Sequence, residues 1–211
     1  MVIFRTFLLR DLRRSGIGWV GVSYLLAVLT TFAFAIGPDL PLLRRLAPAL
    51  AWSGVLLALV VACQNIFEED YRDGTVDRLR AENVSLAIYA AGIMTAKWIG
   101  HAVPLVPAAL LLGLAFGLHV EAAVALAGAI LLGTPAVVAI VSIASAIVGN
   151  RSRKSVVLPL VALPLCVPIV VFGVEASRPN GVPAAAVLLA VDIVAVLVAP
   201  FAAGRAIVEV D

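Results

Sequence analysis

Long runs of apolar residues alternate with short polar segments along the whole chain. Six runs are long enough for a membrane-spanning helix, which needs about 20 mostly apolar residues. They lie at about 16–36, 46–67, 98–118, 122–148, 156–175 and 183–204. Within them, stretches such as Ser53–Ala62 and Ala122–Leu132 are apolar on every side, whereas the strands of a membrane barrel alternate. The pattern predicts an all-α polytopic membrane protein with six transmembrane helices.

Composition supports a membrane location. Apolar residues make up 63% of the 211 residues, against roughly 45–50% in soluble domains. A soluble fold of this size has no interior that could hold so much apolar surface. Six spans use most of the chain, so we expect one transmembrane domain over residues 1–211. Cys63 and Cys166 fall within spans, where we expect small core residues rather than a disulfide.

The N-terminal residues 2–14 predict a short amphipathic helix. Phe4, Leu8 and Leu12 share one helical face, and basic residues occupy much of the remainder. Such a helix suits the membrane surface, although the segment also fits a basic flank of the first span. Ala33-Phe34-Ala35 resembles a signal-peptide cleavage site, but the apolar run before it is long enough to span. We therefore expect the first span to be retained.

The placement of positive charge predicts the orientation. With both termini in the cytoplasm, only three of the 15 Lys and Arg residues lie outside, namely Arg44, Arg45 and Arg178. Basic residues concentrate in cytoplasmic loops of membrane proteins, so this orientation is favoured over its reverse.

A polar segment between the second and third spans is the main candidate for function. Residues 68–82 hold six of the 13 acidic residues and are too few to form a domain. Asp73-Gly74 predicts a break between two short helices. Residues 83–97 are mildly apolar, and Lys97-Trp98 fits the point of return to the membrane.

We interpret residues 67–82 as a docking segment through which a separate ATPase moves the spans; the alternative is a solvated loop. Phe67, Tyr71 and Leu79 would form its apolar face, continued by Thr75, and Gly74 would allow the turn. The expected polar contacts are Glu68, Glu69, Asp70, Arg72 and Asp73.

Prolines are frequent in the third, fourth and fifth spans, and they predict kinked, tightly bundled helices. Each proline frees a backbone group that a neighbouring helix must satisfy. Asp192, in the middle of the sixth span, is costly in a bilayer. It is therefore either a functional residue or hydrogen-bonded to another helix. His101 and His119 could ligate haem iron or carry a proton, or be ordinary polar residues.

Two enzymatic interpretations lack residues that they need. Asp70, Asp73-Gly74 and Asp77-Arg78 nearly match the start of the CDP-alcohol phosphatidyltransferase motif, but Leu86–Ala96 contains no acid to complete its metal site. The sequence before Lys154-Ser155 lacks the glycines of a phosphate-binding loop. We expect no catalytic residues, no metal and no nucleic-acid partner.

Motifs spread along the chain resemble the CcmB family, also called haem exporter protein B. The matching residues occur in the family's order from the Arg-rich N-terminus onward. They are Ile36-Gly37-Pro38, Leu46-Ala47-Pro48 with Trp52, Phe67-Glu68-Glu69-Asp70, Asp73-Gly74-Thr75, Lys97-Trp98, Leu132-Gly133-Thr134-Pro135, Leu158-Pro159-Leu160 with Pro164 and Pro168, Phe172-Gly173, and Pro200-Phe201-Ala202.

The resemblance implies a permease subunit of the ABC complex for cytochrome c maturation, with an ABC-2-type arrangement in the bacterial inner membrane. It implies that residues 67–79 contact the ATP-binding subunit CcmA, with CcmC, CcmD and the haem chaperone CcmE as further partners. We also expect membrane lipid as a partner, and pairing with a second permease copy or a related subunit. ATP and haem would be held by those partners, so no cofactor is expected on this chain. The alternative is an ABC-2 permease that exports a drug, a lipid or a polysaccharide.

Overall fold

The structure is a computed structural model that describes residues 2–15, 18–148 and 154–209. Every element in the described part is a helix, which confirms the all-α prediction. The helices are α1 (Val2–Ser15), α2 (Trp19–Ile36), α3 (Leu40–Cys63), α4 (Glu68–Arg72), α5 (Thr75–Ala81), α6 (Leu86–Lys97), η1 (Trp98–Ala102), α7 (Leu105–Ala115), α8 (Val120–Val148), α9 (Lys154–Ala176) and α10 (Val182–Glu209).

Six helical stretches of the described residues are long and apolar enough to cross a membrane, as the hydropathy pattern predicts. They are Trp19–Ile36, Leu40–Arg72, Leu86–Ala115, Val120–Val148, Leu158–Ala176 and Val182–Val208. The third begins at Leu86 rather than near residue 98, because the mildly apolar residues after 85 continue the same helix. The expected start of the first span at residue 16 lies outside the described residues.

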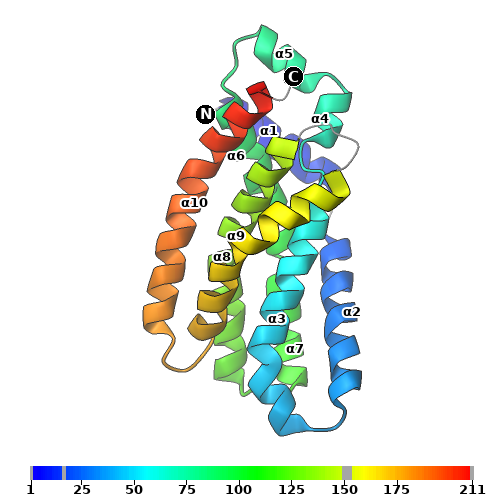
Figure 1. Cartoon of the computed structure of the whole chain (residues 1–211), viewed down its shortest axis with the longest axis vertical. Helices are drawn as coiled ribbons and strands as arrows, with labels where there is room; N and C mark the ends of the chain where they lie inside the picture. Colours follow the sequence, from blue (N-terminus) through cyan, green and yellow to red (C-terminus); the bar gives the residue numbers. More distant parts are fainter. Residues whose placement is uncertain (1, 16–17, 149–153, 210–211) are drawn as a thin grey trace.

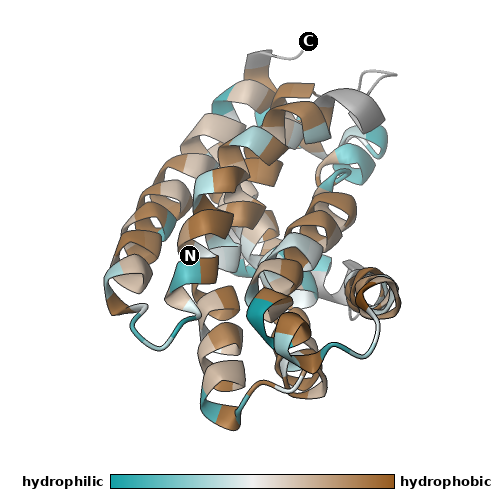
Figure 2. Cartoon of the chain, turned by 60° about the horizontal axis from the view of Figure 1, so that its bottom comes forward, coloured by the Kyte–Doolittle hydropathy of each residue, from teal (hydrophilic) through white to brown (hydrophobic). Residues whose placement is uncertain are grey.

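The helices form an elongated bundle with a clear polarity along its axis. Both termini, α4 and α5 lie at one end, and the turns α2–α3, α7–α8 and α9–α10 lie at the other (Figure 1). Hydrophobic residues cover most of the long helices, as Figure 2 shows. The candidate docking segment therefore shares its side of the bundle with both termini, as the orientation prediction requires.

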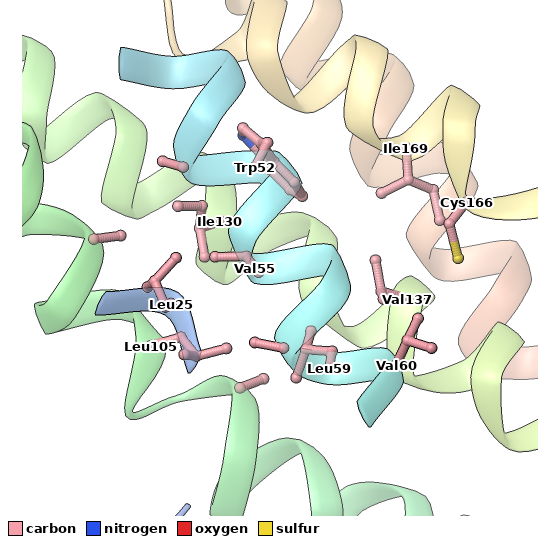
Figure 3. Packing of buried hydrophobic residues seen from close by; sticks show 14 of the residues in the cluster. Leu25, Trp52, Val55, Leu59, Val60, Leu105, Ile130, Val137, Cys166 and Ile169 are labelled. Atoms are coloured by element: carbon pink, nitrogen blue, oxygen red, sulfur yellow. The ribbon is translucent and has the colours of Figure 1, made fainter. Parts of the chain in front are cut away.

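The central helix α8 packs against α3, α7, α9 and α10. Trp52 of α3 is fully buried among side chains from the surrounding helices (Figure 3). Its ring lies against Gly133 of α8 and Gly173 of α9, and its indole N–H donates to the Ser177 hydroxyl at 3.4 Å. Cys63 and Cys166 are free thiols buried in this core, which confirms their predicted role.

A proline explains an irregular turn in the third span. Pro104 has no N–H to donate to the Gly100 carbonyl one turn before it. The helix widens there into the π-turn η1, in which the Val103 N–H donates to the Trp98 carbonyl at 3.1 Å. The Gly18 N–H, at the entry to α2, donates to the Gly100 carbonyl at 2.9 Å. A neighbouring segment thus satisfies the freed group, as predicted for the prolines of this span.

Candidate functional site

The segment between the second and third spans forms two short helices, as predicted. Gly74 separates α4 from α5 with a φ of +70°, a left-handed conformation that glycine adopts at little cost. The Asp73 carboxylate accepts the Thr75 N–H at 3.0 Å and fixes the start of α5. The turn therefore has a defined shape set by two adjacent residues.

The apolar side of this segment packs inside the chain. Phe67 and Leu79 are 1% and 7% exposed, and with Val76 they join a core formed with α6 and α10. Tyr71 packs against the same core. The predicted apolar docking face is therefore corrected: because α6 begins at Leu86 and returns beside the segment, these residues anchor it to the bundle.

Asp70 is also buried, although we expected it at the surface. Its Oδ2 accepts from the Arg10 guanidinium of α1 at 2.5 Å and from the Tyr89 hydroxyl of α6 at 2.7 Å. The Phe7 ring lies 5.0 Å from the Arg10 guanidinium carbon and packs edge-on against Tyr89. Hydrogen bonds to an ionised group are about twice as strong as neutral ones. We call Arg10, Asp70 and Tyr89 the Asp70 triad; it joins three helices.

A second ion pair fastens α1 to α6. Lys97 Nζ lies 3.3 Å from the Asp11 carboxylate, and both side chains are largely buried. Lys97 is thus held by α1, and the placement of Lys97-Trp98 at the membrane boundary stays a prediction. Trp98 donates its indole N–H to the Thr134 hydroxyl of α8 at 3.1 Å.

Two further contacts tie the segment to the rest of the bundle. The Arg80 guanidinium donates to the Ile207 carbonyl near the end of α10. The Ser145 hydroxyl of α8 donates to the Gln64 carbonyl at 3.1 Å, just before α4. A displacement of α4 and α5 would therefore act directly on α1, α6, α8 and α10.

The surface that remains open to a partner is polar. Glu69, Arg72 and Asp73 are exposed on α4 and its turn, while Glu68 is half-buried and pairs with Arg72 at 2.5 Å. Asp77 and Arg78 extend this surface along α5, and Thr75 is half-buried. A protein that docks here would meet mixed charges rather than an apolar patch.

A second polar site lies inside the bundle, at Pro135 of α8. Pro135 cannot donate to the Leu131 carbonyl, and the Thr134 hydroxyl does so instead at 3.4 Å. One residue further on, the Ala136 N–H donates to Asp192 of α10 at 2.7 Å. This part of α8 is thus held by η1 through Trp98 and by α10 through Asp192. This contact agrees with the interpretation of Asp192 as hydrogen-bonded to another helix.

The two histidines do not assemble a recognisable centre. His101 lies in η1 beside Gly18, and its buried Nδ1 has no hydrogen-bond partner in the described part of the chain. Within residues 2–15, 18–148 and 154–209, no group of three or more His, Cys, Asp or Glu could hold a metal. Whether His101, His119 or Asp192 takes part in transport stays a prediction.

The role of Asp192 can be tested by two substitutions. Asp192→Asn keeps an acceptor for the Ala136 N–H and is expected to cost under about 1 kcal/mol of stability. Asp192→Leu removes the carboxylate that accepts from that buried N–H and is expected to cost about 1–3 kcal/mol. Thermal unfolding in detergent measures both. Equal losses in the two variants would contradict the hydrogen-bond role, and a loss of function in a stable Asn variant would indicate that the charge itself is used.

The fold is that of a multi-pass α-helical membrane protein, with a structured polar segment at the end that carries both termini. The chain belongs to the CcmB family. The family, whose description is CcmB protein, matches residues 1–210 of this chain. It is 34% identical to heme exporter protein B of Bradyrhizobium diazoefficiens, over 93% of this chain and 91% of that protein. It is also 34% identical to heme exporter protein B of Rhodobacter capsulatus, over 96% of this chain and 97% of that protein. The predicted family is therefore confirmed.

Proposed function

We propose that this chain is the membrane subunit of a haem exporter complex that serves cytochrome c maturation in the bacterial inner membrane. A separate ATPase, corresponding to CcmA, docks on α4 and α5 from the cytoplasm and supplies the energy. Haem is held by partner subunits corresponding to CcmC and CcmE, and CcmD completes the assembly. The outcome of each cycle is export of haem or release of the haem-loaded chaperone.

The observation that carries this proposal is the family match over nearly the whole chain. The similarity to relatives that bear the name heme exporter protein B extends over almost the full length of those proteins. This favours haem export over the alternative of a permease for a drug, a lipid or a polysaccharide.

The contacts of α4 and α5 support a route by which movement of a docked ATPase would reach the membrane spans. The exposed side of α4 and α5 offers charged groups to a soluble partner. Their buried side is held by the Asp70 triad, by Phe67 and Leu79, and by the Arg80 contact with α10. Because rigid, packed elements move together, closure of the ATPase would displace α1, α6 and α10 with the segment.

The docking contact is tested by reversing exposed charges. Glu69→Lys with Arg72→Glu should reduce co-purification of the ATP-binding subunit at least about tenfold, since like charges across an interface cost several kcal/mol. The two residues are exposed, so the folded chain should be retained.

The matched control is Glu175→Lys with Arg178→Glu. This exposed pair also lies three residues apart, but at the opposite end of the bundle. It should leave co-purification unchanged. Wild-type recovery of the ATPase with the Glu69 and Arg72 variant would show that the partner docks elsewhere, without affecting the family assignment.

A further inference from the structure

A groove of about 970 Å³ lies between α10 and the start of α6, at the end that carries both termini. It is distinct from the exposed charges of α4 and from the Asp70 triad. Its apolar part is lined by Val198, Phe201 and Ala202 of α10 and by Leu86 of α6. Arg80 and Arg205 line its polar part.

The order of these residues along α10 fits an amphiphile. At 1.5 Å per residue, Arg205 lies about 10 Å nearer the end of the span than Val198. A ligand in the groove would therefore meet hydrocarbon side chains within the span and guanidinium groups at its edge. This is the order of acyl chain and headgroup in a lipid of the adjacent leaflet.

The charges of the groove select the headgroup. Arg80 is held by the Ile207 carbonyl and lies 3.9 Å from Asp77, so it is fixed in place. Arg205 is exposed, and no carboxylate whose side chain the structure describes pairs with it. The first turn of α6 also faces the groove through Leu86 and Ala87, and its N-terminal backbone groups add positive potential.

The shape of the groove is fixed by a close helix contact. Gly204 lets α10 approach the beginning of α6, because a side-chain carbon there would lie 2.9 Å from the Ala87 backbone nitrogen. The wall behind the groove is thus closed, while Phe201 and Val208 leave its outer side exposed, 66% and 55% respectively. The opening therefore faces outward from the bundle, toward lipid.

We propose that this groove binds an anionic phospholipid, with the phosphate at Arg205 and Arg80 and an acyl chain along Val198, Phe201 and Ala202. Basic pockets between spans on the cytoplasmic side of membrane proteins recognise such headgroups. The site would fasten α10 and the start of α6 to the leaflet beside the docking segment. This function is independent of haem export and of the ATPase contact.

The test is native mass spectrometry of the full-length chain in detergent, titrated with phosphatidylglycerol or phosphatidylcholine. The wild type should retain phosphatidylglycerol several-fold more strongly. Arg205→Gln should weaken that lipid about fivefold, because one such charge is worth about 1 kcal/mol near a membrane surface. Inorganic phosphate should not displace the lipid, since it lacks the acyl chain.

Two controls separate charge from shape. Arg45→Gln removes an exposed arginine at the opposite end of the bundle and should change nothing. Ala202→Phe fills the apolar part of the groove and should lower the retention of both lipids. Equal retention of the two lipids by the wild type, or wild-type binding in both groove variants, would overturn the proposal.

A photo-crosslinking residue in place of Phe201 identifies the molecule that occupies the groove in the native membrane. A lipid adduct on the chain is expected. A protein adduct at this position would overturn the proposal, because it would make the groove a subunit interface.

Discussion

Asp70→Ala is expected to lower the stability of the folded chain by about 3 kcal/mol. Asp70 is 4% exposed, and it is an acceptor for both Arg10 and Tyr89. Removing one member of a buried ion pair costs about 3–5 kcal/mol, because the other charge stays buried and unpaired. The Arg10 side chain is 31% exposed and can be partly hydrated, which places the loss at the lower end of that range.

The loss can be measured as a fall in the midpoint of thermal unfolding in detergent. Asp77→Ala is the matched control, because Asp77 is 78% exposed and lies 3.9 Å from Arg80. An exposed pair of this kind contributes about 0–1 kcal/mol. If the Asp70 and Asp77 variants lose the same stability, Asp70 has no special structural role.

Tyr89→Phe separates the hydrogen bond from the charge. It removes only the hydroxyl that donates to Asp70 and leaves the aromatic packing against Phe7 and Phe67. The expected loss is about 1 kcal/mol, as for a typical buried hydrogen bond. A loss as large as that of Asp70→Ala would assign most of the energy to Tyr89 rather than to Arg10.

The sequence was sufficient to predict the spans and the fold class. A bilayer demands long apolar helices, and that demand is visible in any window of about 20 residues. The break at Asp73-Gly74 was also predictable, since it depends on adjacent residues only. The start of the third span was not, because Leu86–Lys97 contains Tyr89, Thr95 and Lys97, which lower its hydropathy although they are satisfied inside the bundle.

The Asp70 triad could not be predicted from spacing. Arg10 and Asp70 are separated by 60 residues and lie on different helices. The helical pattern placed basic residues away from the apolar face of α1, but Arg10 and Asp11 contact α4 and α6. One signal was available in the sequence. Asp11 is a single acidic residue among several arginines of α1, and a lone acid in a basic helix indicates an ion pair with another part of the chain.

The prolines predicted that neighbouring groups satisfy the carbonyls they free, and the structure identifies those groups. Freed carbonyls at Gly100 and Leu131 are both satisfied, one by the Gly18 backbone and one by the Thr134 hydroxyl. The sequence indicated that partners must exist but not which ones. Trp98 was assigned to the membrane interface, and its contact with Thr134 depends on how the third and fourth spans are packed.

Gly173→Ala is expected to destabilise the chain by about 1–3 kcal/mol, although alanine is the better helix former. A methyl group at Gly173 would lie 2.4 Å from two carbons of the Trp52 ring. Trp52 is fully buried, and its indole is held by Ser177, so the ring cannot move aside freely. Overpacking of a tight core costs about 1–3 kcal/mol.

Gly128→Ala is the control, since Gly128 is exposed on α8 and has open space around its position. There the gain in helix propensity, up to about 1 kcal/mol, should not be offset. Both variants are compared by thermal unfolding in detergent. In a Trp52→Phe background the ring is smaller, so the cost of Gly173→Ala should shrink, and a double-mutant cycle measures the difference. If that cost is unchanged when the indole is gone, contact between Gly173 and Trp52 does not limit the packing of α3 against α9.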